Sequence, residues 1–118
     1  MGIIGGKLSD SCAVIAHRGA SGIAPENTMA AFRAAVEQGA DALEFDVQLT
    51  SDRQPVVIHD PRLERTTNGR GSVRKCCYED LMELDAGSHF SRAYAEERIP
   101  HLEEVLWTFR GELRMNIE

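Results

Sequence analysis

The sequence lacks any long hydrophobic run. Among its 118 residues, the longest unbroken apolar stretch covers only residues 12–16, whereas a helix needs roughly 20 apolar residues to cross a bilayer. We therefore expect no transmembrane segment. The first eleven residues also lack the charged start and apolar core of a secretory signal, which favours a cytoplasmic protein.

The sequence also contains fewer basic than acidic side chains. The chain has 13 Lys and Arg residues against 19 Asp and Glu residues, which gives a formal net charge of −6. Sequence-independent binding of nucleic acid depends on basic side chains that neutralise phosphates, so we expect no nucleic-acid partner. A phosphate-containing ligand would have to be held by local groups, because the overall field of the protein repels it.

Cysteine is scarce, and its three positions suit neither a disulfide nor a zinc site. Cys76 and Cys77 are adjacent, and neighbouring cysteines cannot readily close a bond without distorting the backbone. Cys12 lies in an apolar run and is expected to be a small buried residue. The spacing matches no zinc-ligand pattern. We interpret all three as free thiols, which again points to a reducing compartment.

What the sequence does contain is an alternation of strand and helix patterns. Apolar runs predict strands at residues 13–16, 42–49, 55–58 and 113–117. Apolar residues at helical spacing predict a helix that Asn27 or Thr28 caps and that ends by Gly39, and another between Pro100 and Gly111. A short helix is expected within residues 78–84. This order predicts an α/β fold with a mainly parallel sheet covered by helices.

Two carboxylates stand out on the second predicted strand. A strand has a period of two, so Glu44 and Asp46 face one side while Phe45 and Val47 face the other. Buried carboxylates need a partner or a cation, and the oxygen-preferring Mg²⁺ or Ca²⁺ would suit this pair. The alternative interpretation is the solvated face of an edge strand.

Two histidines each close an apolar run. His17 ends the first predicted strand and His59 follows the third. In parallel β/α folds the loops after the strands form the active site, where two histidines can divide acid and base roles. Ordinary polar loop residues are the alternative. Arg18 suits a phosphate or a salt bridge to a nearby carboxylate. His89 and His101 are expected to be surface or capping residues.

Several short motifs occur in a specific order along residues 13–118. They are His17-Arg18-Gly19, Ala24-Pro25-Glu26-Asn27-Thr28, Glu44-Phe45-Asp46, His59-Asp60, Leu63-Glu64-Arg65-Thr66-Thr67-Asn68-Gly69 and Asn116-Ile117-Glu118. The ordered set resembles the glycerophosphodiester phosphodiesterases. The resemblance implies a TIM (β/α)8 barrel that hydrolyses small-molecule glycerophosphodiesters to an alcohol and sn-glycerol 3-phosphate with a divalent metal, Mg²⁺ or Ca²⁺.

The resemblance also implies a role for particular residues. By similarity the metal ligands are Glu44, Asp46 and Glu118, the acid–base pair is His17 and His59, and Arg18 binds the phosphate. Which histidine is the acid stays open. The less regular residues 61–99 resemble an insertion that caps the site and helps to recognise the glycerol.

The length of the chain sets a limit on this interpretation. Residues 1–12 would be a lead-in, and residues 13–118 would supply only about the first four strands of a barrel that usually needs around 250 residues. Such a piece exposes unpaired strand edges. We therefore expect the N-terminal portion of a longer enzyme, with a homo-oligomer that completes the barrel as the less favoured alternative.

Two other functions remain open at this level. Phospholipase D-like toxins that cleave sphingomyelin use a similar barrel and two histidines, although the stretches at 24–28 and 65–69 favour the diesterase. A non-catalytic module that binds glycerophosphate without turnover is the other alternative. Turnover of a choline lipid with release of free choline would favour the first, and metal binding without hydrolysis would favour the second.

Overall fold

A computed structural model describes residues 2–4 and 14–118 of the chain. The strands are β1 (Gly2–Ile4), β2 (Ile15–His17), β3 (Ala42–Phe45), β4 (Val47–Leu49), β5 (Pro55–Val57) and β6 (Arg114–Ile117). The helices are α1 (Met29–Glu37), α2 (Tyr78–Leu81) and α3 (Leu102–Phe109), with 3₁₀ turns η1 (Val73–Lys75) and η2 (Arg92–Tyr94). No helix in these ranges is long and apolar enough to span a membrane.

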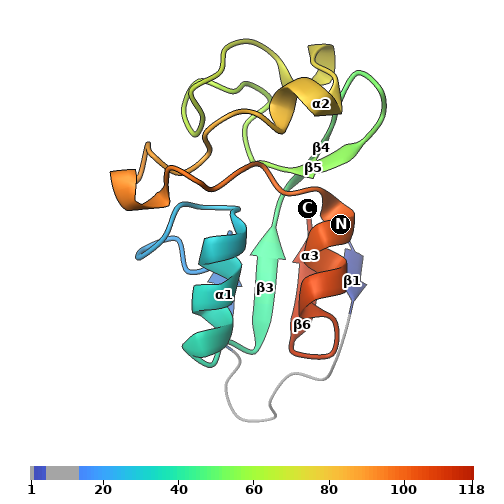
Figure 1. The fold of residues 1–118 in the computed structure, drawn as a ribbon. Coiled ribbons are helices and arrows are strands. Elements are labelled where there is room, and N and C mark those ends of the chain that lie inside the picture. The colour runs from blue at the N-terminus through green and yellow to red at the C-terminus, as the bar shows by residue number, and fades with distance from the viewer. Residues whose placement is uncertain (1, 5–13) are drawn as a thin grey trace.

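A four-stranded sheet forms the base of the molecule, in the order β1-β6-β3-β2. Strands β2, β3 and β6 are parallel, and β1 runs antiparallel beside β6. Helices α1 and α3 lie over the same face of this sheet (Figure 1). The parallel sheet with helical connections agrees with the predicted α/β architecture, and within the described ranges the sheet stays open.

Three aromatic rings hold the two helices against the sheet. Phe32 of α1 lies between Phe45 of β3 and Phe109 of α3, with ring centroids 5.5 Å and 6.1 Å apart. All three side chains are buried. Tilted and edge-on aromatic pairs of this kind add stabilisation beyond their buried area, so this cluster fixes how both helices lie on β3.

A second, smaller core lies at the end of the sheet toward which β3 points (Figure 1). Strands β4 and β5 form an antiparallel pair there, and the chain between them and α3 adds η1, α2 and η2. The buried residues of this core are Val56, Ile58, Leu63, Val73, Leu81, Ala86 and Ile99. The segment that looked irregular in the sequence therefore packs around a second apolar core, to which β5 also contributes.

Two strand predictions need correction. The strand predicted at residues 42–49 breaks at Asp46 into β3 and β4, and the strand predicted at 55–58 joins β4 instead of the parallel sheet. The physical reason is the short connection through residues 50–54. Antiparallel neighbours can be joined by a few residues, whereas parallel strands need a crossover of a dozen or more.

Local signals at the helix ends were largely confirmed. Thr28 caps α1 by accepting a hydrogen bond from the Ala31 amide, and Gly39 follows the helix with a left-handed φ of +78°. His101 caps α3, its ring accepting from the Glu103 amide. The short helix expected within 78–84 is α2. Cys12 lies outside the described residues.

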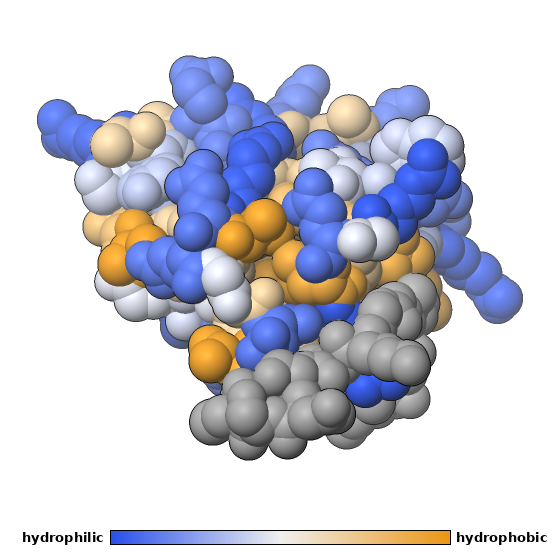
Figure 2. Space-filling model, turned by 90° about the horizontal axis from the view of Figure 1, so that it is seen from below, coloured by the Kyte–Doolittle hydropathy of each residue, from blue (hydrophilic) through white to orange (hydrophobic). Residues whose placement is uncertain are grey.

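The lower end of the molecule combines hydrophilic and apolar surface. Figure 2 views the end from which β3 starts and shows apolar patches among hydrophilic residues. The edge strand β2 contributes to the exposed apolar surface, because Ile15 is 51% exposed and the preceding Val14 is 57% exposed.

Two glycines with the same backbone conformation allow a matched test. Gly19 and Gly39 have φ of +81° and +78°, but a Cβ on Gly19 would meet the backbone of Ala31 at 2.8 Å, while Gly39 has open space. Gly39→Ala should therefore cost only the left-handed strain, about 1–2 kcal/mol. Gly19→Ala should cost at least ~1 kcal/mol more because of the clash. Urea unfolding measures both, and equal losses would contradict this packing.

Candidate active site

Three polar residues occupy one row across the parallel strands. Glu44 of β3 pairs in register with His17 of β2 on one side and with Asn116 of β6 on the other. The neighbouring residues Phe45 and Met115 are buried against the helices. Since successive strand residues alternate between faces, the row lies on the face away from α1 and α3. His17 and Glu44 are in contact there, with Nε2 and Oε1 3.0 Å apart.

A second row follows one step further along β3 and β6. The Glu118 amide donates to the carbonyl of Phe45 at 2.9 Å, and the Val47 amide donates to the carbonyl of Glu118 at 2.8 Å. This is the parallel ladder pattern that places Glu118 beside Asp46. The backbone thus brings the three predicted metal ligands to adjacent positions at the carboxyl ends of two strands.

The Asp46 carboxylate is buried and already has partners. Asn27 donates to its Oδ2 at 3.1 Å, and Arg18 Nε lies 3.4 Å from the same oxygen. Arg18 also donates from Nη1 to Glu26 at 3.1 Å. The salt-bridge alternative for Arg18 is therefore what the structure shows, while phosphate binding stays a prediction. Arg18 and Asn27 both have a φ of +57°, an uncommon conformation that turns the loop back over β3.

His59 lies in a second group of charged side chains. Its Nδ1 is 2.7 Å from Asp60 Oδ1. Arg65 binds Asp60 with two hydrogen bonds, of 2.9 and 3.0 Å, and binds Glu26 with two more, of 2.8 and 3.0 Å. Gln48 of β4 donates to the His59 carbonyl at 2.9 Å. Side-chain contacts thus connect His59 to Arg18 through Asp60, Arg65 and Glu26, whereas His17 contacts Glu44.

These contacts lower the pKa values of the Asp60 and Glu26 carboxyl groups. Hydrogen bonds from Arg65 and then His59 hold the pKa of Asp60 far below its usual range. Burial opposes ionisation of Glu26, but hydrogen bonds and charge from Arg65 and Arg18 outweigh it and lower the pKa of Glu26. The same carboxylates, Asp60 before Glu26, raise the pKa of Arg65. All three groups are therefore charged at neutral pH.

The predicted metal ligands are adjacent along the backbone but their side chains are not gathered. Within residues 14–118, no three His, Cys, Asp or Glu side chains come together as a metal site. Glu44 contacts His17, Asp46 contacts Arg18, and Glu118 is exposed. The donor chemistry nonetheless suits a hard cation, because every side chain offers oxygen. The buried Oδ1 of Asn116, next to Glu44 in register, has no hydrogen-bond partner, which is uncommon for a buried acceptor.

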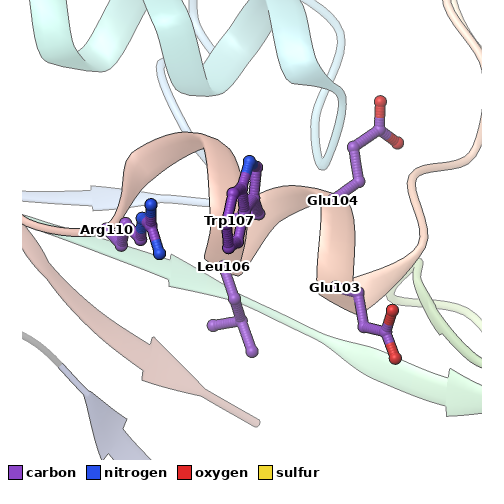
Figure 3. Close-up of a pocket in the computed structure, with 5 residues that line it drawn as sticks. All are labelled: Glu103, Glu104, Leu106, Trp107 and Arg110. Carbon is purple, nitrogen blue, oxygen red and sulfur yellow. The ribbon is translucent and has the colours of Figure 1, made fainter.

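A separate hollow of about 600 Å³ lies on the outer surface of α3. Its lining includes Trp107, which is 69% exposed, and Arg110, whose guanidinium lies 3.7 Å from the centre of the Trp107 ring (Figure 3). None of the predicted catalytic, phosphate-binding or metal-binding residues lines this hollow. The candidate active site is therefore the charged region at the carboxyl ends of the strands.

Sequence reasoning missed part of this region. Asn116 could have been found, because it precedes Glu118 by two residues and so shares its strand face. Glu26, Asp60 and Arg65 stood inside the motifs, but nothing in their local spacing indicated that they contact one another.

One protein family matches nearly all of the residues that the structure describes. The glycerophosphoryl diester phosphodiesterase family matches residues 17–118. A glycerophosphodiester phosphodiesterase from Caldanaerobacter subterraneus is 56% identical over 78% of this chain and 38% of its own length. One from Bacillus altitudinis is 49% identical over 89% of this chain and 44% of its own length.

Solved structures agree with the sequence matches. A glycerophosphodiester phosphodiesterase from Agrobacterium tumefaciens is 41% identical with a TM-score of 0.88, over 89% of this chain and 46% of that one. A phosphodiesterase from Oleispira antarctica, in complex with the product sn-glycerol-3-phosphate, is 43% identical with a TM-score of 0.81, over 90% and 43%. The chain thus spans less than half the length of these relatives.

The lowered pKa values of Glu26 and Asp60 predict acid-sensitive stability. Their contribution is complete above their usual values of 4.5 and 3.8 and is lost as the pH falls toward the lower values of the folded state. Glu26→Gln and Asp60→Asn should each lower the unfolding free energy by about 1 kcal/mol at neutral pH, allowing for solvent exposure. The difference from wild type should shrink between about pH 4.5 and pH 2.

Urea unfolding across this pH range measures the effect. Glu112→Gln is the control, because Glu112 is exposed and forms none of the ion pairs found in residues 14–118. A gap between wild type and the Asp60 variant that stays constant with pH would contradict the assignment.

Proposed function

Because the chain belongs to the glycerophosphoryl diester phosphodiesterase family, we propose that the protein hydrolyses glycerophosphodiesters to an alcohol and sn-glycerol 3-phosphate, with Mg²⁺ or Ca²⁺. Its fold is the TIM-barrel type of that family, of which the described residues form an open part. The observation that carries the proposal is the placement of His17, Glu44 and Asp46 at the carboxyl ends of adjacent parallel strands. The relative from Oleispira antarctica that binds the product adds support.

In this proposal Glu44, Asp46 and Glu118 hold the cation. Their adjacent backbone positions and the spare oxygen of Asn116 support this assignment. A cation bound there would neutralise negative charge on the phosphoryl oxygens of the substrate. Glu44 contacts His17 through Oε1 and Asp46 contacts Arg18 through Oδ2, so each carboxylate has a second oxygen to offer a cation.

Arg18 is the proposed phosphate-binding residue. Its buried Nε lies 3.4 Å from Asp46 and makes no hydrogen bond, so the guanidinium lies beside a proposed metal ligand with its hydrogen bonding incomplete. A guanidinium presents its donors in a planar fork that fits phosphate oxygens. The segment of residues 61–99 is proposed to cap the site and help recognise the glycerol, which agrees with its place beyond the end of β3 (Figure 1).

The two histidines carry the proton transfers. One imidazole accepts the proton of the attacking hydroxyl or water, and the other protonates the alkoxide that leaves when the phosphorus–oxygen bond breaks. His59, with Nδ1 directed to Asp60, keeps Nε2 for this transfer. His17 lies beside Glu44, at the proposed metal site.

Release of sn-glycerol 3-phosphate from glycerophosphocholine tests the proposal directly. We expect release with Mg²⁺ or Ca²⁺, none with EDTA, and a loss of about 10²-fold or more in His17→Ala and in His59→Ala. His89→Ala is the control, because His89 is exposed and lies outside the site. Full activity in EDTA or in His17→Ala would overturn the mechanism. Because this reaction itself releases choline as the alcohol, the sphingomyelinase D-like alternative is tested separately, by release of choline from sphingomyelin.

Cation binding is a second expected property, and calorimetry measures it without turnover. Asp46→Asn should weaken binding of Mg²⁺ or Ca²⁺ by on the order of tenfold or more, a loss typical even of residues outside the direct ligand set. Glu37→Gln is the matched control on the exposed end of α1. Equal affinity in wild type and Asp46→Asn would exclude Asp46 as a ligand. Binding that is intact without hydrolysis would favour the non-catalytic alternative.

A further inference from the structure

One guanidinium connects two loops of the candidate active site. Arg65 donates from Nε and Nη2 to the two oxygens of Asp60, and from Nη1 and Nη2 to the two oxygens of Glu26. Glu26 lies in the loop between β2 and α1, whereas Asp60 follows β5. A pair of bidentate contacts uses the planar fork of arginine on both sides, and the point charge of a lysine cannot reproduce that geometry.

Each of these two carboxylates also contacts a residue of the proposed mechanism. Asp60 Oδ1 faces His59 Nδ1 at 2.7 Å. Glu26 Oε2 accepts from Arg18 Nη1 at 3.1 Å. Arg65 itself touches neither His59 nor Arg18 through any hydrogen bond that the described residues form, so its action on both is indirect.

The state of Asp60 decides which nitrogen of His59 carries a proton. An ionised carboxylate can only accept hydrogen bonds, and the hydrogen bond made by one ring nitrogen of a histidine sets the tautomer. Arg65 binds both oxygens of the ionised Asp60 carboxylate and so holds it toward His59 Nδ1. The neutral imidazole therefore holds its proton on Nδ1. Glu26, which lines the same small hollow as His59, is the other acidic group at this place, and Arg65 neutralises it as well.

We propose that Arg65 is a positioning residue: through Asp60 it fixes His59 with its proton on Nδ1 and Nε2 free, and through Glu26 it fixes Arg18 beside Asp46. The catalytic meaning of this arrangement rests on the proposed function. The arrangement itself does not, since it can be measured in the absence of substrate.

The tautomer of His59 is the primary readout. Nitrogen-15 NMR of the imidazole rings near pH 8, where neutral histidine dominates, distinguishes a proton on Nδ1 from one on Nε2. We expect the Nδ1–H form for His59 in wild type and a shift toward the Nε2–H form in Arg65→Gln. Asp60→Ala should produce the same shift. His89, which is exposed and distant from these ion pairs in the sequence, serves as the internal reference.

Arg62→Gln is the matched control. Arg62 lies in the same segment, is 64% exposed and pairs with Glu64 alone among the described ion pairs. The Arg62→Gln substitution therefore removes the same charge as Arg65→Gln but leaves the contacts of Asp60 and Glu26 intact. It should leave the His59 signals unchanged. Arg65→Lys keeps the charge but not the fork, and provides a second variant if Arg65→Gln fails to fold. We expect it to shift the tautomer in the same direction.

The proposal is overturned if a folded Arg65→Gln or Arg65→Lys variant keeps the wild-type tautomer, or if Arg62→Gln shifts His59 equally. Loss of hydrolysis cannot be mistaken for this result, because the NMR measurement needs no turnover. A tautomer shift in a chain that does not hydrolyse glycerophosphocholine would support the positioning role while removing the proposed function. Where hydrolysis is measured, Arg65→Gln should lower kcat on the order of tenfold, less than the loss from His59→Ala.

Discussion

Parallel pairing of β2, β3 and β6 is the constraint on which the candidate site depends. Parallel neighbours end at the same edge of a sheet, so the residues that close each strand become neighbours in space. The register places His17 beside Glu44 and continues the ladder to Glu118 beside Asp46. The aromatic cluster around Phe32 keeps the opposite face of β3 dry, which leaves the polar face as the only place for these side chains.

Features that depend on a few neighbouring residues were predictable from the sequence. Thr28 caps α1 and Gly39 follows it with positive φ, because capping and left-handed turns depend on the chemistry of single residues. The period of two also placed Glu44 on the polar face of its strand. The pairing of β4 with β5 was missed, because an apolar run does not by itself indicate which strand it pairs with. Only the short connection between the two runs indicated an antiparallel pair.

Features that depend on distant residues were not predictable. Arg65 contacts Glu26 across 39 residues of sequence, and no periodicity or spacing relates two such positions. Charge patterns are also ambiguous, since most arginines and glutamates are solvated or form weak surface pairs. The ordered motifs were enough to identify the family, while the ion pairs that connect His59 to Arg18 required the fold.

The place of Trp107 has a consequence for how the molecule can be observed. It is the only tryptophan of the chain, it lies 69% exposed on α3, and its ring is covered on one side by Arg110. Since the indole is already largely in water in the folded state, its emission wavelength will change little on unfolding. Its fluorescence will also not respond to a ligand bound at the carboxyl ends of the strands. Circular dichroism is therefore the better optical signal for this protein.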